Sequence, residues 1–310
     1  MLGRIIEVAD DHRSLSIRHG LMIVEETQPE QQELGTVPLD DILAVIVHAR
    51  GVTYRHSVLV ALAERGIPFV ICGSTHNPVG FLVSLDGHHQ QAHRFEAQIA
   101  ATKPTHKRLW ASLVKAKLAQ QAAVLNGIGQ AGTSVSALVS QVRSGDPANV
   151  EALGARRYWR LLFGDGFRRN RQAGNVNGLL NYGYTVARAA TARAVVAAGL
   201  HPSIGLHHSH DENAMRLVDD LMEPFRPLVD LQVWRLVQSG QASVTPDTKR
   251  PLVLSLYADL QTKSGATPVV VCMQRLATSL AQIYLRQREV LDLPVPGLPL
   301  GFLARHPEQP

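Results

Sequence analysis

The stretch IGLHHSHDENAMRLVDDLMEPFRP, residues 204–227, places three histidines directly before a segment rich in acidic side chains. The spacing predicts a helix from about Asn213, on which Asp219 and Asp220 lie four and three positions before Glu223. Side chains at these spacings are neighbours on a helix surface, so the carboxylates would repel one another by roughly 0.2–0.5 kcal/mol per pair. A bound cation would relieve this repulsion, and the stretch is therefore interpreted as half of a metal site.

Composition places the chain among globular proteins of a reducing environment. It has 310 residues, 45% of them hydrophobic, which is enough for a large core and for two domains. Its two cysteines, Cys72 and Cys272, are too far apart to suggest a disulfide framework or a thiolate zinc site. The first residues lack an apolar signal core, and the most apolar segment, 184–200, contains two arginines. We therefore expect a cytoplasmic protein without a membrane span.

The pattern of apolar residues changes along the chain and predicts an α+β protein. Up to residue 87, short alternating segments predict a mostly β domain with one helix, Ser57 to Arg65, that ends at Gly66. From residue 93 to 293, long segments rich in Ala, Leu, Gln, Arg and Lys predict a larger, all-helical domain. Within it, Thr245 to Pro251 is predicted to be a loop, and the proline-rich tail 294–310 is predicted to be irregular.

A cluster of arginines follows the predicted start of one helix in the second domain. The chain carries a net charge of +5, which suits a polyanionic partner such as DNA. Guanidinium groups hold phosphate oxygens in bidentate geometry, so the cluster predicts a DNA contact, with a solvated helix face as the alternative. Tyr158 and Trp159 lie within it and could stack on an unpaired base, although aromatic side chains at such positions more often belong to the core. The predicted DNA-binding residues are Arg156, Arg157, Arg160, Arg168, Arg169 and Arg171.

Glu151 lies just before these arginines, at the predicted start of the same helix. Asn149 is expected to cap the helix, which puts the Glu151 carboxylate in the first turn, where the helix dipole favours its ionised form. An ionised carboxylate is what a divalent cation requires. On its own, a glutamate in a helix is far more often an ordinary solvated side chain than a metal ligand.

Four segments resemble the CRISPR-associated integrase family Cas1 in order and spacing, most closely the form found in type II systems. The first is the stretch quoted above, whose Gly-apolar-His-His and Asp-Asp-Leu-Met-Glu-Pro-Phe-Arg-Pro elements are similar to the family's signature. The second, residues 149–159, is similar to the helix that bears the family's catalytic glutamate. The third, residues 177–184, reads NGLLNYGY, and the fourth, weaker one runs from Arg108 to Ala122.

The resemblance implies a set of metal ligands. Carried over position by position, these are Glu151, His208 and Glu223, while Asp220 is a second acid near the metal, as an extra ligand or an outer base. The role of His207, which also fits the pattern, is less clear. Two carboxylates and one imidazole leave coordination positions open for phosphate and hydroxyl oxygens. Oxygen ligands suit Mg²⁺, and the single nitrogen makes Mn²⁺ at least as suitable.

The resemblance also implies a reaction and partners. The family joins the 3′ hydroxyl of a captured DNA fragment to a phosphodiester of the CRISPR repeat, and water in place of that hydroxyl would give endonuclease activity. Family members act as homodimers, two of which flank a dimer of Cas2, so the β domain is expected to form the dimer interface. The alternatives are a structure-selective metal-dependent DNA nuclease and a DNA-binding scaffold without catalysis.

Other interpretations of the same residues fit less well. Segment 208–213 resembles the His-x-His-x-Asp-His element of metallo-β-lactamase-fold nucleases, but Glu212 and Asn213 stand where that element needs Asp and His. The His210-Asp211 dipeptide also occurs in HD phosphohydrolases, but no well-placed outer histidine and aspartate accompany it, and we interpret His210 as incidental. The sequence contains no P-loop, no dinucleotide-binding glycine pattern and no Gly-x-Ser-x-Gly elbow, so nucleotide-driven, nicotinamide and serine-hydrolase chemistry are disfavoured.

Overall fold

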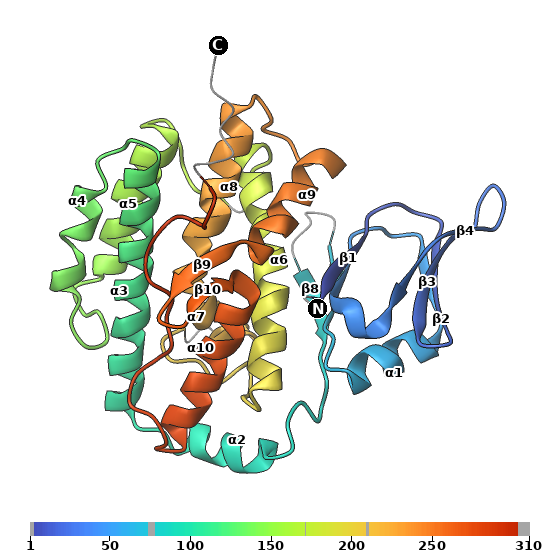
Figure 1. Cartoon of the computed structure of the whole chain (residues 1–310), viewed down its shortest axis with the longest axis horizontal. Coiled ribbons are helices and arrows are strands. Elements are labelled where there is room, and N and C mark those ends of the chain that lie inside the picture. The colour runs from blue at the N-terminus through green and yellow to red at the C-terminus, as the bar shows by residue number, and fades with distance from the viewer. Residues whose placement is uncertain (1–2, 74–77, 171, 209–210, 303–310) are drawn as a thin grey trace.

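The computed structural model describes residues 3–73, 78–170, 172–208 and 211–302. Strands gather in the first part of the chain and helices in the rest, so the α+β prediction is confirmed (Figure 1). The limits of the two domains, 1–87 and 93–293, stay predictions. No helix within the described ranges is long and apolar enough to cross a membrane.

The N-terminal part contains two four-stranded sheets. One sheet has the order β1-β5-β7-β8, in which the first three strands are parallel and β8 is antiparallel. The other has the order β4-β3-β2-β6. Helix α1, His56–Glu64, packs on β2 and ends just before Gly66, whose φ of +61° is the left-handed conformation expected there. The strands are β1 Arg4–Val8, β2 Arg13–Arg18, β3 Leu21–Glu26, β4 Gln32–Pro38, β5 Ile42–Val47, β6 Val52–Tyr54, β7 Phe69–Cys72 and β8 Pro78–Leu82.

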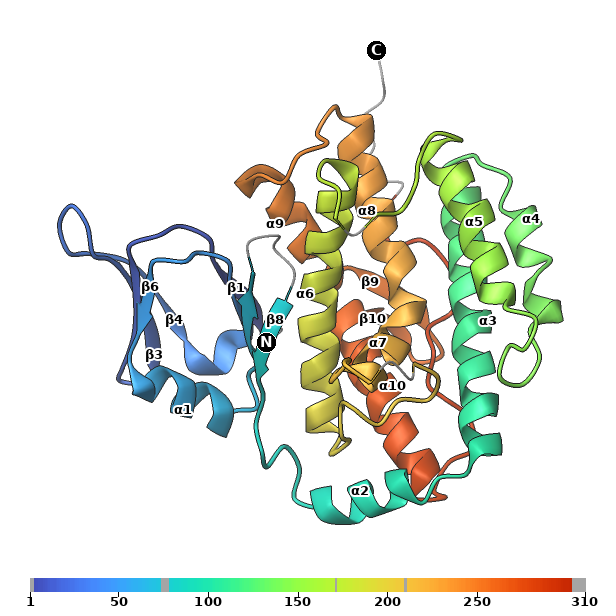
Figure 2. The same cartoon turned by 180° about the vertical axis from the view of Figure 1, so that it is seen from behind.

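Strand β5 connects the cores of the two parts. Ile42, Val45 and Val47 pack into the N-terminal core, whereas Ala44 and Ile46 pack into the helical core. Side chains alternate between the faces of a strand, so a continuous apolar strand needs cover on both sides. Helix α6 supplies the second cover, and Figure 2 shows it between the N-terminal strands and helices α3 and α5.

Helix α6, Val176–Ala197, is the centre of the helical part. Most of its residues are buried, because α7, α8, α9, α10 and β5 all pack against it. Helix α3 begins with Thr102 as its cap and Pro104 in its first turn, a combination typical of helix starts. The other helices are α2 Gln91–Ile99, α3 Lys103–Gly127, α4 Thr133–Ser136, α5 Val150–Phe163, α7 Arg216–Met222, α8 Arg226–Gln238, α9 Pro246–Leu254 and α10 Val269–Tyr284.

The structure differs from the sequence prediction at three places in the helical part. The segment expected as a loop forms helix α9, which Thr245 and Thr248 start by bonding to each other's backbone N–H. An antiparallel hairpin of β9, Asp259–Thr262, and β10, Gly265–Pro268, precedes α10. Helix α7 begins at Arg216 rather than near Asn213, because the Asn213 side chain accepts a hydrogen bond from the Met215 N–H and holds the chain in a turn.

Residues 294–302 pack back onto the helices. Residues 294–302 form neither helix nor strand, and Gln120 Nε2 donates to Gly297 O at 2.7 Å. Phe302 is buried at the end of this segment. Residues 303–310 of the predicted irregular tail lie outside the described residues.

A buried ionic cluster joins the two parts. Glu7 of β1 accepts a hydrogen bond from the Tyr182 hydroxyl at 2.9 Å and forms an ion pair with Lys249 Nζ at 2.6 Å. Tyr182 lies in α6 and Lys249 in α9, so one carboxylate of the sheet holds two helices of the other part. Lys249 supplies the positive charge that this partly buried carboxylate requires.

Candidate active site

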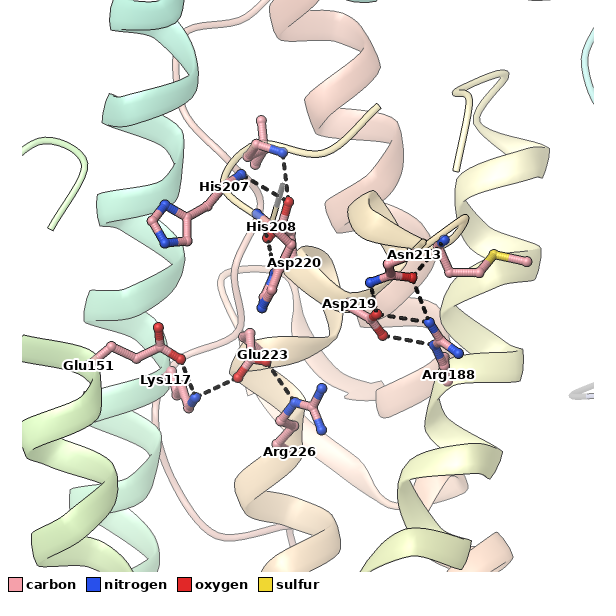
Figure 3. Close-up of polar contacts among 12 residues, drawn as sticks. Lys117, Glu151, Arg188, His207, His208, Asn213, Asp219, Asp220, Glu223 and Arg226 are labelled. Atoms are coloured by element: carbon pink, nitrogen blue, oxygen red, sulfur yellow. Dashed lines mark hydrogen bonds and ion pairs between the residues drawn. The ribbon is translucent and has the colours of Figure 1, made fainter. Parts of the chain in front are cut away.

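Asp220 anchors the histidine-containing loop to helix α7. Its Oδ2 accepts hydrogen bonds from the backbone N–H of Leu206 at 2.6 Å and of His207 at 3.2 Å, and its Oδ1 accepts one from His208 N at 3.3 Å (Figure 3). A Cβ on Gly205 would lie 2.9 Å from Asp220 Oδ2, so only glycine lets the loop close this tightly. The Gly-x-x-His element is thus wrapped around a fully buried carboxylate.

The same carboxylate orients the predicted ligand His208. The Nδ1 of His208 lies 2.6 Å from Asp220 Oδ1, and this hydrogen bond raises the pKa of His208. When Nδ1–H donates to a carboxylate, Nε2 keeps its lone pair for a metal ion. Both Asp220 oxygens are occupied by the loop and by His208, so the geometry favours an outer role for Asp220 over direct ligation. The neighbouring His207 is exposed and stacks on Trp110 with ring centroids 4.4 Å apart.

Glu151 lies in the first turn of α5, but Asn149 does not cap that helix. Asn149 adopts a left-handed conformation with φ of 49°, and its side chain makes no capping bond. Asp146 caps instead, since its carboxylate accepts from Val150 N at 2.9 Å and from Glu151 N at 3.0 Å. One turn further, Gly154 lets α5 approach α3, because a Cβ there would lie 2.1 Å from Leu118. This close approach brings Glu151 beside Lys117.

Lys117 lies between the two glutamates that were expected to bind the metal. Its Nζ is 2.5 Å from Glu151 Oε1 and 2.5 Å from Glu223 Oε2 (Figure 3). Burial alone would favour a neutral amine, but the two carboxylates outweigh it and raise the pKa of Lys117. The lysine therefore remains an ammonium ion, and Glu151 and Glu223 already share one cation.

Glu223 begins a 3₁₀ turn, Glu223–Phe225, between α7 and α8, and it is buried. Its Oε1 accepts a hydrogen bond from Arg226 Nε at 2.8 Å. Burial opposes its charge, but Arg226 and Lys117 outweigh burial and lower the pKa of Glu223 to about 2. Its other oxygen, Oε2, lies 2.5 Å from Lys117 Nζ, so each oxygen of this carboxylate faces one cation.

The third acid of the stretch faces away from this group. Asp219 accepts two hydrogen bonds from Arg188, both at 2.8 Å, and one from Asn213 Nδ2 at 2.8 Å. The sequence interpretation that all three acids crowd one cation is therefore wrong in detail. Each acid has its own partner, and only Glu151 and Glu223 share a cation between them.

These residues offer a donor set that suits a hard divalent ion, although they do not yet enclose one. Among the described residues, no three His, Cys, Asp or Glu side chains are close enough to hold a metal ion together. The Lys117 ammonium lies between Glu151 and Glu223. Two carboxylates whose facing oxygens meet at one cation position, and an imidazole whose Nδ1 is held by Asp220, match Mg²⁺ or Mn²⁺ in chemistry.

A cleft of about 840 Å³ opens on the arginine-bearing side of α5. Leu153, Trp159 and Phe167 contribute apolar surface to it. Trp159 is half-buried and packs with Phe163 and Phe167, whereas Tyr158 is fully buried and belongs to the core. The five described arginines of the predicted cluster line the cleft, namely Arg156, Arg157, Arg160, Arg168 and Arg169.

The side chains of these arginines differ in the number of hydrogen bonds and ion pairs that they make. Arg156 is exposed and makes no hydrogen bond or ion pair within the described residues, while Arg160 pairs with the exposed Asp165. Arg169 is more fixed, since it donates to Asn177 Oδ1 and Asn181 Oδ1 and lies over the Tyr184 ring. Two residues that the sequence analysis named, Arg171 and His210, lie outside the described residues.

Sequence reasoning missed three residues that shape the site. They are Lys117, Arg226 and Asp146. Arg226 is three positions after Glu223, a spacing that predicts a helical ion pair. Asp146 lies in a Gly-Asp-Pro turn before the helix, where an acidic cap is common. Lys117 left no local signal, because its partners are distant in sequence.

Comparison with known sequences gives a consistent result. The sequence model of the family described as "CRISPR associated protein Cas1" matches residues 6–254. A "CRISPR-associated endonuclease Cas1" of Neisseria meningitidis serogroup C (strain 8013) is 34% identical over 275 residues, which is 86% of this chain and 90% of that protein.

Comparison with solved structures shows the same fold at lower identity. A "Casposase bound to integration product" aligns with a TM-score of 0.79 at 19% identity, covering 93% of this chain and 92% of that chain. A chain of a "Cas6-RT-Cas1--Cas2 complex" aligns with a TM-score of 0.76 at 17% identity, covering 96% of this chain and 36% of that one.

Proposed function

Because the chain belongs to the Cas1 family of CRISPR-associated proteins, we propose that it is a metal-dependent DNA integrase and endonuclease of CRISPR spacer acquisition, closest to the type II form. A Cas1 relative named as an endonuclease and a casposase solved with an integration product support this class of activity. The observation that carries the proposal is the meeting of Glu151 from α5 and Glu223 from the turn after α7 at one cation position. His208 lies beside this position on its own anchored loop (Figure 3).

In this proposal, Glu151, Glu223 and the Nε2 of His208 would hold Mg²⁺ or Mn²⁺. A divalent ion bound there would supply positive charge to the scissile phosphate and lower the pKa of the attacking hydroxyl. Asp220 keeps the His208 ring in the orientation that leaves Nε2 free. Arg226 keeps the Glu223 carboxylate ionised and fixed through its other oxygen.

The proposed reaction is a transesterification without a protein nucleophile. The 3′ hydroxyl oxygen of the DNA fragment attacks a phosphorus of the repeat, a new P–O bond forms, and the P–O bond to the repeat's own 3′ oxygen breaks. The attacking hydroxyl loses its proton, and the departing 3′ oxygen takes one up. Within the described residues, the side-chain hydrogen bonds and ion pairs of Glu151 and Glu223 go to Lys117 and Arg226 and to no serine, threonine or cysteine.

DNA is proposed to reach the site along the arginine-lined cleft. Arg156, Arg157 and Arg160 are exposed on α5, on the same helix as Glu151. A backbone held there by phosphate contacts would run toward the carboxylates, because the helix spans only a few turns between them. Arg169 is already bonded to Asn177 and Asn181, so we assign it to the cleft wall rather than to a mobile phosphate contact.

The proposed assembly follows the family. We propose a homodimer formed through the β domain, two of which flank a Cas2 dimer in the cytoplasm. The structure of a Cas6-RT-Cas1–Cas2 complex, whose chain contains a similar fold, supports a Cas2 partner. An endonuclease that uses water as the nucleophile is the second candidate, since the relative from Neisseria meningitidis bears that name.

The metal-ligand assignment predicts that Glu151→Ala, His208→Ala and Glu223→Gln each abolish DNA cleavage and joining in Mg²⁺ or Mn²⁺. The loss should exceed about 1000-fold, because a metal ion contributes several kcal/mol to such reactions. Glutamine is chosen at position 223 because alanine would leave the buried Arg226 without its partner. Strand cleavage and joining are measured on labelled DNA, and circular dichroism checks the fold.

The matched control is Asp211→Asn, which removes an acid of the same stretch that is fully exposed and pairs with Arg216. This variant should keep full activity. An active Glu223→Gln protein would show that the ligand assignment is wrong.

A further inference from the structure

We propose that Lys117 is a built-in competitor of the metal ion: its ammonium holds Glu151 and Glu223 together, and a divalent ion has to displace it to bind. The inference rests on the proposed function in so far as a divalent ion binds these glutamates. It assigns to Lys117 the role of a positioning residue that sets metal affinity.

The distances leave no room for both cations. Lys117 Nζ lies 2.5 Å from Glu151 Oε1 and 2.5 Å from Glu223 Oε2. An Mg²⁺ ion would bind such oxygens at roughly 2.0–2.1 Å. An ion that takes both oxygens would therefore occupy space that the ammonium fills, and the two positive charges would repel each other strongly in this buried setting.

The contacts of Lys117 also allow it to leave. The lysine stem is flexible, and a compact ammonium lacks the rigid bidentate geometry by which a guanidinium holds a carboxylate. Glu151 is partly exposed, with 22% of its side chain accessible, so an ion can enter from that side. Displacement leaves Glu223 with Arg226, which is bound through Oε1 at 2.8 Å and does not stand between the two glutamates.

These contacts give Arg226 and Lys117 different roles. Arg226 neutralises Glu223 through Oε1, an oxygen that the metal ion would not bind. Lys117 neutralises Glu223 Oε2 and Glu151 Oε1, the two oxygens that the metal ion would bind. Without Lys117, Glu151 and Glu223 would face each other with one fewer positive charge. The pair would then bind a divalent ion more tightly and would be less stable without one.

The test is Lys117→Met, titrated with Mn²⁺ by isothermal calorimetry and unfolded thermally in EDTA and in Mn²⁺. We expect a Mn²⁺ affinity at least about tenfold higher than that of the natural protein, since one opposite charge at this range changes a carboxylate's affinity for a cation by that order. In EDTA the variant should unfold at a lower temperature, and Mn²⁺ should raise its Tm by more than it raises that of the natural protein.

The matched control is Lys249→Met. Lys249 is as buried as Lys117, with 11% of each side chain accessible, and it pairs with Glu7 outside the site. Its loss should lower the Tm in EDTA but leave the Mn²⁺ affinity within about twofold, because the metal site is untouched.

Lys117→Arg keeps the positive charge, so it tests the inference even if Lys117→Met does not fold. A guanidinium holds two carboxylates more firmly than an ammonium does, so this variant should bind Mn²⁺ more weakly than the natural protein. Unchanged or weaker Mn²⁺ binding by Lys117→Met, or unchanged binding by Lys117→Arg, would overturn the inference alone. Absence of any Mn²⁺ binding to the natural protein would instead overturn the proposed metal site, and the inference with it.

Discussion

Asp220 organises the histidine loop through its hydrogen bonds. Its carboxylate is buried, accepts three backbone hydrogen bonds from the histidine loop and holds His208 Nδ1. Asp219, the preceding residue, points to Arg188 instead. Of these two adjacent aspartates on one helix, Asp220 therefore holds the histidine loop and Asp219 pairs with Arg188. The sequence alone does not distinguish these two roles.

Asp220→Asn should destabilise the protein in a pH-dependent way. An amide at this position cannot replace the charged acceptor for His208, and loss of a buried hydrogen-bonding partner costs about 1–3 kcal/mol. Asp220 raises the pKa of His208 above 6.5, so the pair's stabilising effect is fully present below pH 6.5 and is lost as the pH rises through the folded-state pKa. Urea unfolding in EDTA at a series of pH values measures the free energy of unfolding of both proteins. The difference between the natural protein and Asp220→Asn should become smaller at high pH.

Asp219→Asn provides the comparison at the neighbouring position. It breaks the pair with Arg188 and leaves the hydrogen bond between Asp220 and His208 in place, so its cost should be nearly constant with pH. If the loss of unfolding free energy in Asp220→Asn were also constant with pH, the carboxylate would support only the loop and not the charge of His208.

At the scale of elements, helix α5 links the proposed metal site to the cleft proposed to bind DNA. Asp146 caps its start and Gly154 lets it approach α3, which together place Glu151 beside Lys117. The exposed arginines follow on the same helix. A rigid helix therefore carries both the carboxylate and the proposed phosphate contacts.

Replacing Arg156, Arg157 and Arg160 together by glutamine should weaken DNA binding and its salt dependence. Each phosphate contact that is lost reduces the slope of log affinity against log salt by about 0.9. Sequence preference should change little, because phosphate contacts position a protein without reading bases. Fluorescence anisotropy at several salt concentrations measures the slope.

The control for this variant is the triple replacement of Arg18, Arg50 and Arg65, which are exposed in the N-terminal part. It removes the same charge away from the cleft and should keep the natural slope. Equal slopes for all three proteins would assign the α5 arginines to an ordinary solvated face.

Elements with a clear apolar periodicity or capping residue could be predicted from the sequence. Elements that begin with proline, and contacts between distant segments, could not. The β5 strand and the end of α1 at Gly66 follow from local patterns. Helix α9 was missed because Pro246 and Pro251 look like breaks, whereas Pro246 begins the helix and the Thr245–Thr248 capping box stabilises that start. Lys117 could not be predicted, since its contacts with Glu151 and Glu223 arise only when three distant segments meet.

At the scale of the whole molecule, the site forms where α3, α5, the histidine loop and the start of α8 meet. Figures 1 and 2 show these elements on the side of α6 away from the strands, so the N-terminal part is free to serve another role. Glu7 fixes that part to α6 and α9 through Tyr182 and Lys249. This separation agrees with the proposal that one part dimerises while the other acts on DNA.

The most direct test of the account is a joining assay that separates an integrase from a nuclease. The natural protein, Mn²⁺, a Cas2 partner and a repeat-containing target are combined with a labelled DNA fragment that ends in either a 3′ hydroxyl or a 3′ deoxy group. We predict covalent joining of the hydroxyl-ended fragment only, no joining by Glu223→Gln, and similar DNA binding in all cases. Hydrolysed products alone with every fragment, or joining that persists in Glu223→Gln, would contradict the account.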